Sequence, residues 1–368
     1  MKLIHCADLH LDSKMTANLD KEKAKTRKAE LLKTFGRMVA YASDNGVSGI
    51  LICGDLFDTK VISATTRNAV ICDIINHPEI DFYYLKGNHD NDNFLSSMDE
   101  IPGNLKLFGD SWTEYTPGES GRVKLFGVEL SHENSMACQT AFVPNPENIN
   151  IVMLHGQESE ALAKDKAEVI DLKLFRNKGI NYLALGHIHQ YKSETLDGAG
   201  KYCYSGCLEG RGFDECGEHG FVLLDIDEEN GRVQDTFIPF AGRKLYTFEI
   251  DISGLESSSE IIAKARGFLE ASQAQNCDLV KIILKGSVSV ECEKDTEYIT
   301  TVLKDDFYFL KVYDETTIFV DYASFAMDES LKGEFVRLVE ASDMPDEYKA
   351  EVIKTGLYVI AGGKIDED

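Results

Sequence analysis

Five short apolar runs in this chain each lead into a polar motif, and this order constrains the fold more than any other feature. The runs cover residues 2–7, 49–53, 82–85, 149–154 and 182–185. Residues 23–42 and 64–76 have helical patterning and lie between successive runs. Strands that alternate with helices need crossover connections, so the pattern predicts an α/β fold.

Side chains that can bind metal ions follow these runs in a set order. The seven residues are Asp8, His10, Asp55, Asn88, His155, His187 and His189. Open α/β sheets bind ligands beyond the carboxyl ends of their strands, so we expect these side chains to converge on one edge. Carboxylate and amide oxygens mixed with neutral imidazoles suit two divalent metal ions, with Mn²⁺ favoured. Paired ions are a recurrent means of cleaving phosphate esters.

A glycine directly precedes three of these predicted ligands, namely Asp55, Asn88 and His187. Glycine has no Cβ, so the chain can turn sharply off a strand and its backbone can approach a bound anion. Each motif alone is a weak signal, but the ordered series at strand ends predicts a shared site.

The motifs carry a family resemblance. The patterns Asp-x-His, Gly-Asp-x-x-Asp, Gly-Asn-His-Asp, His-Gly and Gly-His-x-His resemble those of the calcineurin-like metallophosphoesterase superfamily. Within it, residues 4–13, 204–215 and 220–225 resemble the SbcD-like DNA repair exonucleases, especially the shorter YhaO-like members. The resemblance implies an α/β sandwich core that hydrolyses phosphodiester bonds.

The resemblance also implies roles for individual residues. One metal ion would be held by Asp8, His10, Asp55 and His189, and the other by Asp55, Asn88, His155 and His187. Asp55 would then bridge the two ions. His89 is the expected catalytic proton donor or phosphate contact, and Asp90 is its orienting partner. Asp58 is expected to contact the ligand side chains without binding a metal ion itself.

Other histidines and cysteines are expected to be structural. His5 lies in the first apolar run and is predicted to be a packed, hydrogen-bonded histidine. His77 and His219 are interpreted as loop residues and His132 as a surface residue. A zinc site is not expected in the following group, whose spacing is unlike paired zinc motifs: Cys203, Cys207, Cys216 and His219.

The chain is strongly acidic, with 38 basic and 63 acidic residues and a formal net charge of −25. Because DNA binding draws much of its affinity from neutralised phosphates, we expect weak binding to duplex DNA by the protein alone. Residues 14–33 are the basic exception, and Lys21, Lys23 and Lys25 are candidate substrate-binding residues there. A solvated helix face is the favoured interpretation of this stretch, and a nucleic-acid contact is the other.

Composition predicts a cytoplasmic protein with no membrane association. The nine cysteines are scattered without a disulfide-like spacing, which fits a reducing compartment. The sequence has no long apolar run, and a cleaved N-terminal signal would remove Asp8 with the first strand.

Three domains are predicted: a dinuclear metallophosphoesterase at 1–240, an α+β capping domain at 241–325 and a helical tail at 326–368. Asp328 and Asp343 are the expected N-terminal caps of two tail helices, the second ending near residues 362–363. The resemblance implies that these helices dock onto an SMC-like (SbcC-like) ATPase. Packing within the chain or in a homodimer is the default expectation for these helices, and docking onto the ATPase is the other possibility.

The leading functional prediction is a Mn²⁺-dependent DNA nuclease of DNA repair, a 3′–5′ exonuclease with some endonuclease capacity. Two alternatives remain open. The same core could hydrolyse small phosphodiesters or nucleotides. The protein could also act mainly as a DNA-end-binding regulatory subunit of the ATPase.

Overall fold

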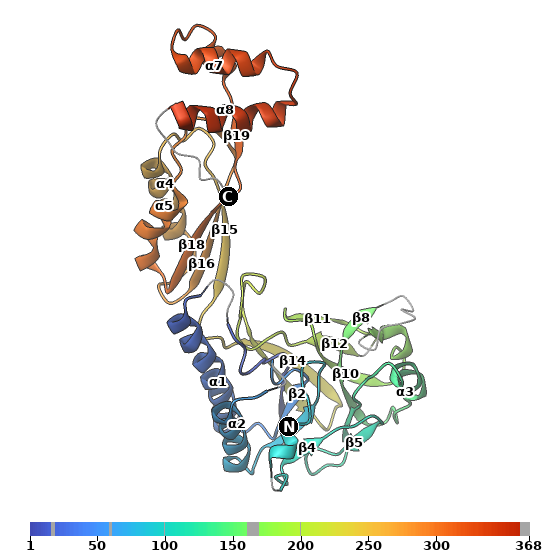
Figure 1. Cartoon of the computed structure of the whole chain (residues 1–368). Helices are drawn as coiled ribbons and strands as arrows, with labels where there is room; N and C mark the ends of the chain where they lie inside the picture. The colour runs from blue at the N-terminus through green and yellow to red at the C-terminus, as the bar shows by residue number, and fades with distance from the viewer. Residues whose placement is uncertain (16–18, 59–60, 99, 160–168, 199, 361–368) are drawn as a thin grey trace. The chain divides into compact units, whose positions relative to one another are not determined.

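The computed structural model describes residues 1–15, 19–58, 61–98, 100–159, 169–198 and 200–360. The chain divides into two compact units, Met1–Lys244 and Leu245–Asp368 (Figure 1). The predicted domain boundaries at 240 and 325 stay predictions. In the described residues, no helix is long and apolar enough to cross a membrane.

The first unit contains two six-stranded sheets. The first sheet has the order β14-β13-β1-β2-β3-β4. Its strands are β1 (Lys2–Cys6), β2 (Gly49–Cys53), β3 (Asp81–Leu85), β4 (Leu105–Leu107), β13 (Gly220–Asp227) and β14 (Arg232–Pro239). The strands β1 to β4 run parallel, and β13 and β14 add an antiparallel edge.

The second sheet has the order β11-β12-β10-β7-β6-β5. Its strands are β5 (Thr113–Tyr115), β6 (Val123–Gly127), β7 (Ile149–His155), β10 (Ile180–Gly186), β11 (Lys192–Thr195) and β12 (Lys201–Tyr204). The strands β6, β7, β10 and β12 are parallel. A separate parallel pair joins β8 (Gln157–Ser159) to β9 (Val169–Asp171).

Five helical segments accompany the two sheets. They are α1 (Lys21–Asp44), α2 (Ala64–Asn76), α3 (Ser135–Ala141) and the 3₁₀ turns η1 (Leu95–Ser97) and η2 (Leu172–Leu174). The predicted helices at 23–42 and 64–76 therefore form, with the first longer by two residues at each end. Asp20 caps α1 and Ser63 caps α2, each accepting a backbone N–H with its side chain.

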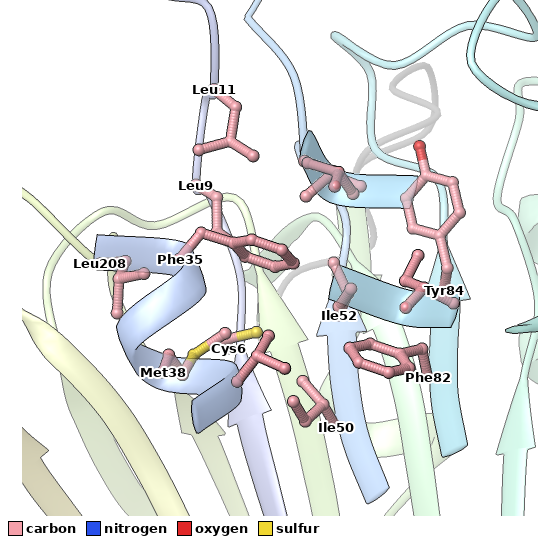
Figure 2. Close-up of a cluster of buried hydrophobic side chains, with 14 of the residues drawn as sticks. Cys6, Leu9, Leu11, Phe35, Met38, Ile50, Ile52, Phe82, Tyr84 and Leu208 are labelled. Atoms are coloured by element: carbon pink, nitrogen blue, oxygen red, sulfur yellow. The ribbon is translucent and has the colours of Figure 1, made fainter. Parts of the chain in front are cut away.

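The strands β1, β2 and β3 of the first sheet are buried on both faces, which is why they read as continuous apolar runs. Along β2, Ile50 and Ile52 belong to one buried cluster, while Leu51 and Cys53 belong to another. The first cluster lies between the sheet and the helices, where Phe35 of α1 packs beside strand residues (Figure 2). The second cluster contains side chains of both sheets and forms the middle of a sandwich.

The second unit has its own core. A parallel sheet of order β15-β16-β18 consists of β15 (Leu245–Asp251), β16 (Leu279–Lys285) and β18 (Phe309–Asp314). The cluster on this sheet also takes in side chains of α4 (Ser258–Ala271) and α5 (Thr296–Leu303), which the 3₁₀ turn η3 (Lys304–Asp306) follows. Ser257 and Glu260 form a capping box that starts α4.

The last described segments form a smaller cluster. It involves β19 (Thr317–Phe319), α6 (Tyr322–Phe325), α7 (Leu331–Glu340) and α8 (Asp346–Ile360). The strand β19 pairs in parallel with β17 (Ser287–Ser289). Several large apolar side chains of α7 and α8 remain exposed, including Leu331, Leu338 and Tyr348. Docking of an ATPase or a second copy onto these helices stays a prediction.

Both predicted caps of the tail helices are wrong. Ser330 caps α7 by accepting the N–H of Gly333, and Asp328 instead accepts the N–H of Ser330 in the preceding turn. The helix α8 begins at Asp346, so Asp343 lies too early in the chain to cap it. The predicted end near 362–363 lies outside the described residues.

Candidate metal centre

The predicted ligands lie where five parallel strands of the two sheets end. Strands β1, β2 and β3 of the first sheet lead to Asp8 and His10, to Asp55 and to Asn88. In the second sheet, His155 is the last residue of β7, and His187 and His189 follow β10. The loops after β1 and β2 stay paired, because the N–H groups of Asp8 and His10 donate to the carbonyls of Gly54 and Asp55. The expected convergence at strand ends therefore occurs across both sheets.

Four of the seven predicted ligands have an uncommon backbone conformation. The angle φ is 52° at Asp8, 44° at His10, 52° at Asp55 and 103° at His187. Positive φ costs free energy in residues with a side chain, and such strain persists where surrounding contacts enforce it. Clustering of these conformations at one edge is typical of a functional site.

Two of the glycines are required by close approach. A Cβ on Gly54 would lie 2.1 Å from Nδ1 of His155, and one on Gly87 would lie 2.2 Å from Oδ1 of Asp55. Gly54 also has φ of +89°, which favours glycine. The predicted sharp turn is present at Gly54, and both glycines bring neighbouring loops close to the ligand side chains.

The first group of ligand atoms contains Asp8, His10 and His189, whose donor atoms all lie within 4.8 Å of one another. Nε2 of His10 lies 3.1 Å from Nε2 of His189. Nδ1 of His189 lies 2.6 Å from Oε1 of Glu215, and Nδ1 of His10 lies 3.2 Å from Oδ1 of Asp58. In both rings Nδ1 thus faces a carboxylate, and the two Nε2 atoms face each other.

The second group contains Asp8, Asp55 and His155, again within 4.8 Å. Nδ1 of His155 donates to the carbonyl oxygen of Cys53 at 2.9 Å. Its Nε2 then lies 3.0 Å from Oδ1 of Asn88 and 3.5 Å from Oδ2 of Asp55. A backbone carbonyl therefore orients this imidazole toward two oxygen atoms.

Asp55 lies between the two groups. Its Oδ2 atom is 3.5 Å from Nε2 of His155 and 3.8 Å from Nε2 of His10. Its Oδ1 atom accepts the N–H of His89 at 2.9 Å. One carboxylate oxygen is therefore near imidazoles of both groups, as a bridging ligand requires.

His187 is placed beside the second group, with its ring 5.4 Å from the His155 ring. Its backbone N–H donates to both oxygens of the Asp8 carboxylate, at 2.9 and 3.0 Å. In the described part of the chain, His187 does not join either three-residue group. All seven predicted ligands lie around one centre, and their assignment as ligands stays a prediction.

The arrangement fits divalent cations. When Nδ1 of an imidazole donates to an oxygen, Nε2 carries a lone pair. The lone pair on Nε2 of His155 then faces the oxygens of Asn88 and Asp55, and Nε2 of His10 lies 3.1 Å from Nε2 of His189. Lone pairs on neighbouring nitrogen and oxygen atoms repel, whereas a cation among these atoms would attract all of them.

Electrostatics support the same interpretation. Burial raises the pKa of Asp8 to about 8, and the neighbouring Asp55 carboxylate adds to this rise. Burial lowers the pKa of His10. The hydrogen bond to His10 and the charge of Arg211 hold the pKa of Asp58 at about 2. A buried carboxylate that disfavours its charged form would be stabilised by a bound cation.

His89 is exposed at the edge of this centre. Its ring lies 5.1 Å from the His10 ring, and a donor atom of His89 groups with those of His10 and Asp58 within 4.8 Å. The site therefore brings the predicted catalytic histidine within reach of the metal ligands.

Asp90 makes contacts to the backbone that were not predicted from the sequence. Its carboxylate accepts the backbone N–H groups of Gly87, Leu56 and Phe57 at 3.0 to 3.2 Å. These three bonds tie the loop after β3 to the loop after β2. Asp90 thus supports the loop backbone, and its role as the orienting partner of His89 stays a prediction.

The predicted substrate-binding lysines lie at the start of α1, where Lys21 and Lys25 are exposed. The next lysine of this helix, Lys28, pairs with Asp12 at 2.7 Å. The DNA contact proposed for Lys21, Lys23 and Lys25 stays a prediction.

Two important neighbours of the site were not predicted from the sequence. Arg211 contacts Asp58 at 3.0 Å and Glu215 at 2.9 Å, and Glu215 contacts His189. The hydrogen bonds from His189 and Arg211 outweigh burial and hold the pKa of Glu215 well below its ordinary value. Both residues lie in the 204–215 stretch that carries the family resemblance, which was the available signal.

Two of the histidines that were expected to be structural, His5 and His219, are buried. His5 is packed as predicted, with Nδ1 2.9 Å from the Tyr182 hydroxyl and Nε2 3.2 Å from the Leu185 carbonyl. His219 is buried, which the loop interpretation missed, and its Nδ1 lies 3.2 Å from Sγ of Cys207. Across the described residues, the cysteines near His219 form no metal-binding group.

Comparison with known proteins now bears on this geometry. The family model for calcineurin-like phosphoesterase matches residues 1–191. This chain belongs to the calcineurin-like phosphoesterase family. The predicted α/β sandwich core is confirmed. Calcineurin-like phosphoesterases use a dimetal centre, and the strand-end groups are candidates for one.

Several relatives are similar over most of the chain. A DNA double-strand break repair protein Mre11 of Saccharolobus solfataricus is 24% identical and covers 89% of this chain and 86% of its own length. An Mre11 protein of Sulfurisphaera tokodaii is 25% identical over 77% of this chain and 73% of its own length. The metallophosphoesterase YhaO of Bacillus subtilis is 26% identical over 64% of this chain and 60% of its own length.

Proposed function

We propose that this phosphoesterase is a Mn²⁺-dependent DNA nuclease, a 3′–5′ exonuclease with some endonuclease capacity that acts in DNA repair. The observation that carries the hydrolytic part is the position of Asp55, whose Oδ2 lies near imidazoles of both ligand groups. The DNA substrate is supported by the Mre11 relatives, since one of them aligns over 86% of its own length.

The predicted site residues would have separate roles in this reaction. Asp8, His10 and His189 would hold one ion, Asn88, His155 and His187 the other, and Asp55 both. When bound, such a pair supplies an activated water and neutralises charge on the phosphate. His89 would donate a proton to the leaving oxygen, since it is exposed beside the ligands. Mn²⁺ suits this mixture of oxygen and imidazole donors.

Net charge favours a second candidate, a small-molecule or nucleotide phosphodiesterase. A chain with a net charge of −25 repels the DNA backbone, whereas a small diester presents little charge. This alternative shares the metal centre, so only the substrate separates the two.

Hydrolysis of end-labelled single- and double-stranded DNA in Mn²⁺, beside bis-p-nitrophenyl phosphate, tests the proposal. We expect a ladder of shortened DNA and release of mononucleotides, both abolished by a chelator. Turnover of the small diester with intact DNA would instead support the second candidate.

The lysines at the start of α1 have a separate expected effect. Changing Lys21, Lys23 and Lys25 to Glu should weaken DNA binding and flatten its dependence on salt, by about 0.9 in log–log slope for each lost phosphate contact. Turnover of bis-p-nitrophenyl phosphate should stay unchanged. The exposed Lys173→Glu serves as the control, and an unaltered salt slope in the triple variant would reject these contacts.

A further inference from the structure

A single arginine connects the orienting partners of two predicted ligands. Nη1 of Arg211 lies 3.0 Å from Oδ1 of Asp58, and Nη2 lies 2.9 Å from Oε1 of Glu215. The same two oxygens face the ligand histidines, since Oδ1 of Asp58 is 3.2 Å from Nδ1 of His10 and Oε1 of Glu215 is 2.6 Å from Nδ1 of His189. The contacts form a closed ring, because the two Nε2 atoms approach to 3.1 Å.

Glu215 is held in place on its other side as well. Its Oε2 atom accepts the backbone N–H of Arg211 at 2.7 Å. The loop carrying both residues is anchored to α1, where the buried Arg27 donates to the carbonyl of Gly210 at 2.9 Å and to Glu209 at 3.2 Å. Arg211 therefore starts from a fixed backbone position.

The two ligand groups are oriented in different ways. In the second group, Nδ1 of His155 is held by the backbone carbonyl of Cys53. In the first group, both imidazoles are held by carboxylate side chains, and Arg211 contacts both of these carboxylates. Loss of the Arg211 side chain would remove one contact from each of Asp58 and Glu215 but leave the backbone contact of His155 unchanged.

We propose that Arg211 is a positioning residue that sets the affinity of one metal site, the one formed with His10 and His189, and leaves the other site largely unaffected. This inference rests on the proposed pair of metal ions. The planar guanidinium spans two carboxylates through separate nitrogens, which a lysine ammonium cannot reproduce with the same geometry. Partners of metal-binding histidines typically contribute about 10- to 100-fold to metal affinity.

The test is a Mn²⁺ titration of the full chain by calorimetry, with EPR of the loaded protein, for wild type and Arg211→Gln. We expect one of two binding steps to weaken by about 10- to 100-fold while the other keeps its wild-type Kd. At one equivalent of Mn²⁺, the EPR spectrum of the variant should be that of isolated Mn²⁺ ions and not of coupled pairs. Arg211→Lys should resemble Arg211→Gln.

Arg122→Gln is the control, because the Arg122 guanidinium also donates hydrogen bonds in the first unit, but to the backbone carbonyls of Glu228 and Glu229. Asp58→Asn is the second variant if Arg211→Gln fails to fold. It should weaken the same binding step, and in combination with Arg211→Gln the two losses should not add.

Equal weakening of both steps, or of neither, would overturn the role of Arg211. Circular dichroism and thermal unfolding of the metal-free variants separate a local effect from general loss of structure. Wild-type protein that binds two Mn²⁺ ions but leaves DNA intact would reject the proposed substrate alone, since the role of Arg211 is read from metal binding.

Discussion

Replacing Asp55 by asparagine is expected to remove nearly all phosphodiesterase activity, by about 10³-fold or more. The amide keeps the shape of the side chain and can still accept the N–H of His89, but it loses the charge that would be shared between two cations. Metal ions contribute several kcal/mol of transition-state stabilisation, and each 1.36 kcal/mol is a tenfold change in rate. Initial rates on DNA and on bis-p-nitrophenyl phosphate measure the loss.

Metal content is the second measurement for Asp55→Asn. We expect fewer than two Mn²⁺ ions bound per chain under conditions that saturate the wild type. Asp171→Asn is a matched control, because Asp171 is also buried in the first unit but accepts the N–H of Lys173 away from the ligand groups. Two tightly bound ions in Asp55→Asn, with normal rates, would contradict a bridging role.

His89→Ala is expected to slow DNA hydrolysis by about 10²- to 10⁴-fold, the usual contribution of a general acid. Turnover of bis-p-nitrophenyl phosphate should fall much less, because p-nitrophenolate is a stable anion that leaves without a proton. The measurement is the ratio of kcat/KM for the two substrates in wild type and variant.

The position of His89 also allows a role other than proton donation. A donor atom of His89 groups with those of His10 and Asp58, so the ring could contact a metal ion or the phosphate. Equal losses on both substrates would favour that contact over proton donation. His132→Ala, at an exposed position, controls for removal of an imidazole.

Strand positions and strand-end motifs were readable from the sequence because their causes are local. Strands buried on both faces must be apolar throughout, which marked residues 49–53 and 149–154 as strands. Glycine before Asp55 and Asn88 was also informative, since a Cβ at Gly54 or Gly87 would clash with a neighbouring side chain. Helix caps were less readable, because Asp328 and Ser330 both suit a cap and only the path of the chain selects Ser330.

The hydrogen-bond and packing partners of residues in and near the site could not be predicted from the sequence in the same way. Asp90 follows His89 directly, yet its carboxylate turns to the backbone of the loop after β2, 33 and 34 residues earlier in the chain. His219 lies outside the strands, yet it is buried against Cys207. Sequence neighbours and spatial neighbours differ wherever a loop packs against a distant segment.

By itself, the sequence determined the order of the strands along the chain, the residue types that end them and the family to which the chain belongs. Only the tertiary structure decided that the predicted ligands come from two sheets and that Oδ2 of Asp55, the expected bridge, lies 3.5 Å from His155 and 3.8 Å from His10. It also decided that Arg211 contacts Asp58, 153 residues away, and so connects the partners of His10 and His189. Apolar periodicity and glycine requirements act within a few residues, whereas hydrogen-bond partners are chosen by the packing of segments that are distant in the chain.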